Sequence, residues 1–342
     1  MTKRVKILLL SVLVVVVLAA VLLISSVMQP GITPKGKRAV LMIPSGARYG
    51  QVLDSVYLNF EVRNRKLFEL IAQKKGYPAK VKPGRYQFDN GTSYLKFINI
   101  LRGGFQTPVR VTFNNVRTIY QLAGKIGKYL ESDSSAIAAF LEDPANYRTN
   151  GFSRENVILA FIPNTYIVYW NTSPAAFFEK MSKEYNRFWN SERSQKADAL
   201  KLTRIEVGIL ASMVDDETLK ADEKPRIAGV YLNRLRRGMP LQSCPTIKFA
   251  LNDFTITRIL YKYLQVDSPY NTYKHTGLPP GPVGCPTTES IDAVLNAEKT
   301  DYLFFAAKAD FSGYHNFSRT LKEHNKYADE YQKELDRRKI FR

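Results

Sequence analysis

Residues 202–218, "LTRIEVGILASMVDDET", form an apolar helical pattern that ends in three adjacent carboxylates. With about 100° between successive residues of a helix, the apolar side chains fall on one stripe. That stripe is made by Leu202, Ile209, Leu210, Met213 and Val214. We therefore predict a helix whose apolar face belongs to the core of a folded domain.

The three carboxylates at the end of this helix point in different directions. Glu217 lies near the middle of the stripe, four residues after Met213, whereas Asp215 points to the opposite side and Asp216 to the edge. An ionised carboxyl group on an apolar face is costly, so burial raises its pKa. Glu217 is therefore the candidate proton donor. The pattern alone leaves equally open that the helix ends there and Glu217 turns to water.

Glu206 lies on the same face and needs a separate explanation. Thr203 and Glu206 have the Thr-x-x-Glu spacing of a capping box, in which the Glu side chain reaches back to the backbone N–H of the cap. This structural role explains Glu206 without chemistry.

Two long polar loops follow the helix, "NRLRRGMPLQSCPT" at 233–246 and "YNTYKHTGLPPGPVGCPT" at 270–287. Their Asn, Gln, Thr and Tyr side chains supply many hydrogen-bonding groups, and their Gly and Pro residues favour rigid turns, a combination suited to sugars. The three histidines lack metal-ligand spacing, and phosphate-binding Gly loops and GxSxG motifs are absent from the sequence. We predict no metal and no cofactor.

The N-terminal part contains an uncharged apolar stretch at residues 7–28, long enough for one transmembrane helix. Lys3, Arg4 and Lys6 precede it, so we expect residues 1–6 in the cytoplasm and the rest of the chain outside. A cleaved signal peptide is the alternative. The stretch exceeds the ~7–15 residues of a signal core and lacks a small-x-small cleavage site, which favours an uncleaved anchor in the lipid bilayer.

A strand-turn-helix pattern then occurs three times, at 39–58, 84–104 and 109–130, after a linker at 29–38. The first two copies predict a small α+β module at 39–107, in which Tyr49, Tyr86 and Phe88 fit the core better than a sugar-binding surface. Longer helical patterns at 174–189, 194–214 and 222–238 predict a larger mixed domain at 108–342. The predicted fold class is therefore α+β.

The formal net charge of +19 favours contact with anionic lipid or with an acidic polymer. Nucleic acid is a poor candidate for the partner, because the folded part of the chain is expected outside the cytoplasm.

Four stretches carry a family resemblance: "LASMVDDET", "YLNRLRRGMPLQSCPTIKFAL", the second loop, and "GYHNFSRTLKEHN" at 313–325. In their order and spacing the chain resembles the MltG (YceG-like) endolytic murein transglycosylases. The resemblance implies that Glu217 is the catalytic acid, that 39–107 is a LysM-like module, and that 108–342 is the catalytic domain. Asp215 replaces the first Glu of the family's motif and Asp216 stands where a basic residue is common, so the resemblance leaves the roles of Asp215 and Asp216 open.

The resemblance also implies an activity and a place. A lytic transglycosylase anchored in the bacterial inner membrane would cut MurNAc-β-1,4-GlcNAc bonds of nascent peptidoglycan, leave 1,6-anhydroMurNAc ends, and terminate strand elongation beside peptidoglycan synthases. We expect glycan contacts from five residues of the motifs, Asn233, Gln242, Tyr270, Asn271 and Thr272. The alternative is an inactive, membrane-anchored scaffold that binds peptidoglycan.

The two cysteines stand in matching motifs of the resemblance, "QSCPT" and "VGCPT", whose loops should line one cleft. We therefore predict a disulfide between Cys244 and Cys285, in a compartment where such bonds persist. It would close a loop of about 40 residues and stabilise the fold by roughly 3–4 kcal/mol.

Overall fold

The computed structural model describes residues 3–36 and 39–340. The chain divides into two compact units. The first unit contains residues 1–110 with 129–131 and 167–173, and the second contains 111–128, 132–166 and 174–342.

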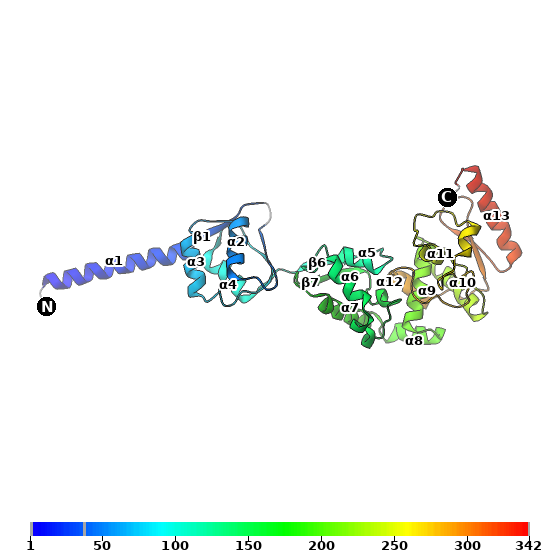
Figure 1. Ribbon diagram of the computed structural model, residues 1–342, viewed down its shortest axis with the longest axis horizontal. Coiled ribbons are helices and arrows are strands. Elements are labelled where there is room, and N and C mark those ends of the chain that lie inside the picture. The colour runs from blue at the N-terminus through cyan, green and yellow to red at the C-terminus, as the bar shows by residue number, and fades with distance from the viewer. Residues whose placement is uncertain (1–2, 37–38, 341–342) are drawn as a thin grey trace. The chain divides into compact units, whose positions relative to one another are not determined.

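The chain from α1 to β6 combines helices with short strands (Figure 1). The helices are α1 (Lys3–Met28), α2 (Tyr49–Asn59), α3 (Arg65–Lys74) and α4 (Tyr94–Gly103). The strands are β1 (Pro30–Pro34), β2 (Val40–Ile43), β3 (Phe60–Val62), β4 (Gly84–Gln87) and β5 (Thr92–Ser93). Two more strands, β6 (Val109–Phe113) and β7 (Asn164–Val168), have residues assigned to both units.

The second unit is mainly helical. Its α-helices are α5 (Ile119–Ile126), α6 (Ser134–Glu142), α7 (Pro174–Phe188), α8 (Ser191–Leu200), α9 (Arg204–Glu217), α10 (Lys224–Arg236), α11 (Cys244–Ala250), α12 (Thr288–Leu295) and α13 (Leu321–Arg337). Short 3-10 helices are η1 (Pro144–Asn146), η2 (Arg148–Asn150), η3 (Val157–Ala160) and η4 (Tyr261–Gln265), and β8 (Phe304–Ala307) pairs antiparallel with β9 (His315–Ser318).

The predicted α+β class is confirmed, but the linker predicted at 29–38 is wrong over residues 30–34. These residues form β1, the central strand of the antiparallel sheet β3-β1-β5. Ile32 of this strand is 1% exposed and lies opposite Val62. The Pro and Gly residues around Ile32 suggest a linker. Tertiary packing of Ile32 in the core makes the segment a strand instead.

The core of the first unit is aromatic, as predicted for Tyr86 and Phe88. Both are buried, and the Phe88 ring stacks on Phe97 with centroids 3.9 Å apart. Tyr49 packs edge-to-face on Tyr77. These rings fill the space between the helices and the strands β2 and β4, so we assign them to packing.

The predicted strand-turn-helix copies correspond to β2 and α2, to β4 and α4, and to β6 and α5. Ser93 caps α4 by accepting a hydrogen bond from the Lys96 backbone N–H. The helix ends at Gly103, and Gly104 adopts a left-handed φ of 71°, which a glycine accommodates without steric cost.

The helix α1 covers the apolar stretch at 7–28. Among the helices built from described residues, none meets both the length and the apolarity that a membrane crossing requires. The transmembrane helix therefore stays a prediction.

The helix α9 lies at the centre of the second unit, in contact with α8, α10, α11 and α12 (Figure 1). The continuous pattern predicted at 194–214 is broken: Lys201 ends α8 in a left-handed conformation, and Thr203 starts α9 with the predicted Glu206 capping box. All residues from Val207 to Val214 are buried, so α9 is covered on every side rather than along one stripe. Its C-terminal carboxylates consequently end inside the domain.

Gly229 allows α10 to approach the chain that follows α12. A Cβ atom at this position would lie 2.4 Å from the backbone oxygen of Glu298. We expect Gly229→Ala to lower the free energy of unfolding by roughly 1–3 kcal/mol, because backbone has to move. The control is Gly124→Ala in α5, where a Cβ meets nothing within 4 Å. Thermal unfolding measures both, and equal stability of the two variants would contradict this account of the packing.

Candidate active site

Glu217 is the last residue of α9, and two hydroxyl groups hold its side chain. The Tyr231 hydroxyl of α10 donates to Oε1 over 2.6 Å, and the Ser243 hydroxyl, just before α11, donates to the same oxygen over 3.0 Å. Both donors come from elements that pack against α9. The position of the carboxyl group is therefore set by three elements rather than by its own helix alone.

The environment of Glu217 favours its neutral form. Burial raises the pKa of Glu217, and the neighbouring Asp216 acts in the same direction, while the two hydroxyl bonds and the nearby His315 partly oppose the shift. Because Oε1 already accepts two hydrogen bonds, the acidic proton belongs on Oε2. A neutral carboxyl group with its proton on a defined oxygen is suited to general-acid chemistry.

Glu217 opens into a cavity of about 330 Å³. The walls come from α10, the loop that follows it, the β8–β9 hairpin and α13. They combine aromatic rings, such as Tyr273 and Phe305, with polar groups, such as Arg234 and His315. A concave site of this size with aromatic walls and a few convergent polar groups is typical of ligand-binding pockets.

The two polar loops do lie together, and Thr272 joins them. The Ser243 backbone N–H donates to Thr272 Oγ1 over 3.0 Å, and the Gln242 N–H donates to the Thr272 carbonyl over 3.0 Å. The Asn271 amide donates to the carbonyls of Leu264 and Val266. Since Asn271 is 0% exposed and Thr272 is 2% exposed, the predicted glycan contacts of these two residues are wrong. They brace the loop that holds Ser243 against Glu217.

The other three predicted contacts differ in their surroundings. Asn233 donates to the carbonyls of Thr300 and Tyr302, so its amide is engaged within the fold. Gln242 is exposed and lines the Glu217 cavity, with a left-handed φ of 53°. Tyr270 lines a separate hollow and packs on Phe249, with centroids 4.7 Å apart. Of the five residues, the structure brings Gln242 to the cavity of Glu217.

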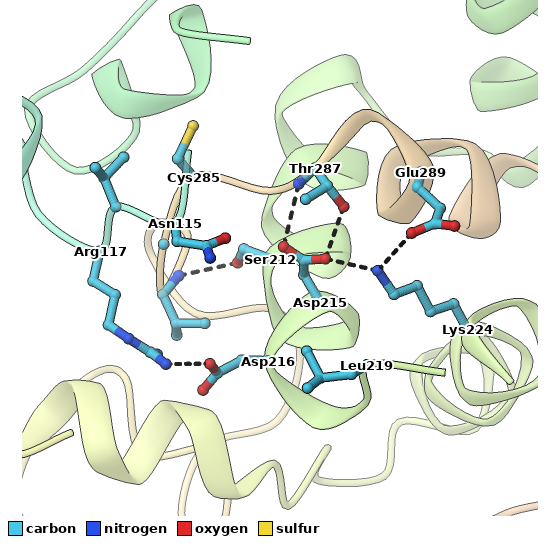
Figure 2. A pocket seen from close by; sticks show the side chains of 13 residues that line it. Asn115, Arg117, Ser212, Asp215, Asp216, Leu219, Lys224, Cys285, Thr287 and Glu289 are labelled. Carbon is cyan, nitrogen blue, oxygen red and sulfur yellow. Dashed lines mark hydrogen bonds and ion pairs between the residues drawn. The ribbon is translucent and has the colours of Figure 1, made fainter. Parts of the chain in front are cut away.

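The other two carboxylates at the C-terminal end of α9, Asp215 and Asp216, face a second hollow, of about 370 Å³ (Figure 2). Asp215 receives hydrogen bonds from Lys224 (2.9 Å), from Thr287 (2.8 Å) and from Ser290. Burial raises the pKa of Asp215, but these bonds outweigh it and leave the pKa below its ordinary value. Asp216 pairs with Arg117 over 2.5 Å. Asp215 and Asp216 therefore have structural ion pairs and point away from the cavity of Glu217.

The predicted disulfide is wrong, because both cysteines are free. Cys244 lies in the Glu217 cavity, 3.5 Å from the Tyr273 hydroxyl. Cys285 lines the second hollow (Figure 2), and its thiol donates to the Phe161 carbonyl over 2.8 Å. The two motifs converge on α9 but reach different cavities. Thr272 makes the link between loops that the disulfide was expected to supply.

We expect thiol titration of the denatured, unreduced protein to find two free thiols per chain. In the native protein both should react slowly, because burial raises the pKa of Cys244 to about 11 and also raises the pKa of Cys285, which keeps both thiols protonated. A count of zero free thiols after denaturation would contradict this expectation and support the predicted disulfide.

Sequence reasoning missed several residues of the site, namely Tyr231, Arg234, Ser243, Tyr273 and His315. All five lie inside the four quoted motifs, so the motifs did carry a signal. Arg234 is 6% exposed and donates to the carbonyls of Leu241 and Leu303, which ties the loop after α10 to the start of β8.

Within the described parts of the chain, no cluster of three or more His, Cys, Asp or Glu residues is arranged to hold a metal ion.

A single half-buried carboxyl group in an aromatic and polar cavity is typical of the ligand-binding or active site of a protein. A family model described as YceG-like matches residues 41–330, and the chain belongs to the YceG-like family. It is 30% identical over 308 residues to a protein named endolytic murein transglycosylase from Bacillus subtilis (strain 168), covering 84% of this chain and 83% of that protein.

A protein of the same name from Streptococcus pneumoniae (serotype 2, strain D39) is 26% identical over 313 residues, covering 79% of this chain and 54% of that protein. Among solved structures, the chain is similar to a crystal structure of a putative YceG-like protein from Listeria monocytogenes. The TM-score is 0.57 and the identity 25%, over 85% of this chain and 98% of that one.

Proposed function

We propose that this protein is a lytic transglycosylase that cleaves the MurNAc-β-1,4-GlcNAc bonds of peptidoglycan strands and leaves 1,6-anhydroMurNAc ends. The observation that carries the proposal is the environment of Glu217, a carboxyl group with a raised pKa, held by Tyr231 and Ser243 at the wall of a cavity. The names of the relatives support peptidoglycan as the substrate class.

The reaction needs one carboxyl group that first gives and then takes a proton. Glu217 protonates the glycosidic oxygen, the C1–O bond breaks, and its electron pair goes to the leaving oxygen. The C6 oxygen of the same MurNAc residue then bonds to C1, and its proton passes to the Glu217 carboxylate. The enzyme returns to its starting state, and no water is consumed.

The composition of the cavity supports this mechanism over hydrolysis. Among the described residues that line it, Glu217 carries the only carboxyl group. A glycoside hydrolase requires a second carboxylate about 5–9.5 Å from the first, to act as nucleophile or to activate water. Asp215 and Asp216 cannot serve, because they bind Lys224 and Arg117 at the other hollow.

Digestion of purified glycan strands with the full-length protein tests the proposal. We expect internal cleavage with anhydro ends, identified by mass spectrometry because they are lighter than reducing ends by one water. Binding without cleavage would instead support the alternative of an inactive peptidoglycan-binding scaffold.

We further propose that residues 7–28 stay on the mature protein and anchor it in the bacterial inner membrane, with residues 1–6 in the cytoplasm. The support is the uncharged apolar sequence and the basic residues that precede it. An anchor would keep cleavage beside newly made glycan, where peptidoglycan synthases work.

For spheroplasts, we expect an added protease to digest everything beyond residue 28, and N-terminal sequencing of the untreated protein to begin at residue 1 or 2. A mature N-terminus between residues 20 and 35 would contradict the anchor.

A further inference from the structure

His315 of β9 lines the same cavity as Glu217, and a buried carboxylate fixes its ring. One oxygen of Glu223 accepts a hydrogen bond from the His315 backbone N–H over 2.9 Å, and the other lies 2.9 Å from the ring Nδ1. The Glu223 side chain is only 4% exposed and that of His315 is 11% exposed. This clamp on both the backbone and the ring leaves the imidazole little freedom to turn.

The clamp determines which ring nitrogen is available to a ligand. With Nδ1–H directed at the Glu223 carboxylate, Nε2 carries a lone pair in the neutral ring and an N–H in the charged ring. A sugar hydroxyl both donates and accepts hydrogen bonds, so it can bind Nε2 in either state. His315 therefore presents a fixed hydroxyl-binding atom to the cavity that contains Glu217.

His324 lines the same cavity from α13 but is held differently. It stacks on Phe304 with centroids 5.3 Å apart, and within the described residues its buried Nδ1 has no hydrogen-bond partner. Because no carboxylate sets its orientation, we assign the hydroxyl-binding role to His315.

We propose that His315 binds the C6 hydroxyl of the MurNAc residue and holds it toward C1, so that the cleaved end closes on itself instead of taking up water. Glu223 is its positioning residue. This inference rests on the proposed transglycosylase function. The C6 hydroxyl is the group that must approach Glu217 after the bond breaks, and His315 lines the same cavity as Glu217.

No net proton transfer to His315 is required. The hydroxyl proton goes to the Glu217 carboxylate as the C6 oxygen bonds to C1, and the imidazole only directs the oxygen. If the hydroxyl is not held, a water molecule can attack C1 instead, which gives a reducing end. The ratio of anhydro to reducing ends therefore reports on this contact directly.

Three variants of the full-length protein separate the atoms involved. His315→Asn keeps an amide near the position of Nδ1, and so keeps the bond to Glu223, but removes Nε2. His315→Gln places an amide near the position of Nε2. Glu223→Gln weakens the clamp and retains the ring. The matched control is His275→Asn, because His275 is an exposed histidine of the loop at 270–287.

Glycan strands are digested in isotopically labelled water, and mass spectrometry counts unlabelled anhydro ends and labelled reducing ends. For His315→Asn we expect anhydro formation to fall about tenfold, the worth of one hydrogen bond, with little change in KM and a clear rise in labelled ends. His315→Gln should form more anhydro product than His315→Asn. Glu223→Gln should form an amount between those of His315→Asn and the wild type, and the control His275→Asn should match the wild type.

An unchanged ratio of ends in both His315 variants would overturn the inference, even if their rates fall, because lost packing slows both outcomes equally. Thermal unfolding checks that the compared variants are folded. If His315→Asn does not fold, the ratio of ends measured for His315→Gln tests the inference. If the wild type itself gives no anhydro ends, the proposed function fails, and that result is distinct from an unchanged ratio.

Discussion

Glu217→Gln should fold like the wild type and lose the formation of anhydro ends by at least about 100-fold, the lower range for removal of a general acid. The substitution keeps the shape and keeps an oxygen that accepts from Tyr231 and Ser243, so the surrounding contacts survive. It removes the acidic proton. Counting anhydro ends by mass spectrometry, with thermal unfolding as the check on folding, measures both parts of the expectation.

The matched control for Glu217→Gln is the neighbouring carboxylate. Asp216→Asn removes a charge one residue away but on the side of Arg117 and the second hollow. It should retain most of the activity. Near wild-type cleavage by Glu217→Gln, or equal losses in the two variants, would refute the assignment of Glu217.

The dependence of activity on pH should follow the same residue. Burial raises the pKa of Glu217, so its neutral, proton-donating form persists to higher pH than in an ordinary carboxyl group. Since the acid must be protonated to start the reaction, kcat/KM should fall as pH rises through that raised pKa. The residual activity of Glu217→Gln should not show this fall of kcat/KM at high pH.

Asp215→Ala should produce the largest loss of stability among the variants proposed for this protein, about 3 kcal/mol. The Lys224 side chain is 6% exposed and is paired with Asp215 at 2.9 Å and with the more exposed Glu289 at 3.2 Å. Removing Asp215 leaves the buried Lys224 ammonium group without its nearest carboxylate. It also leaves the Thr287 and Ser290 hydroxyls without their acceptor. For a unit of this size the melting temperature should fall by roughly 6–12 °C.

Two further variants test this explanation. Glu289→Gln removes the other partner of Lys224 and should cost less than about 1 kcal/mol, because that carboxylate is 58% exposed. Adding Lys224→Met to Asp215→Ala should restore part of the lost stability, since no buried charge then remains. If the double variant recovers no stability, the loss in Asp215→Ala does not come from the unpaired charge of Lys224.

The acid side of the stability profile provides an independent check. The hydrogen bonds to Asp215 leave its folded pKa below the ordinary value, against the opposing effect of burial. A lowered carboxyl pKa stabilises the fold fully above the unfolded pKa of about 3.9, and this contribution is lost as pH falls through the folded value. The difference between the wild type and Asp215→Ala should therefore shrink below about pH 4.

The sequence by itself determined the local features of this protein: the α+β class, the start of α9 at the Thr203–Glu206 capping box, and the choice of Glu217 over Asp215 as the group toward the cavity. These features depend on helical periodicity and on caps, which involve neighbours a few residues apart. The family motifs also belong to the sequence, and they contain Glu217, Tyr231, Ser243 and His315, whereas Glu223 and Phe305 lie outside them.

Only the tertiary structure decided what the residues of those motifs touch. Periodicity describes one helix, and it could not show that α9 is covered on all sides or that Cys244 and Cys285 reach different cavities. It also could not show that Thr272 is turned inward to brace Ser243. Such contacts join segments far apart in the chain, and they are set by packing and by the need to satisfy buried polar groups, which leave no periodic signal in the sequence.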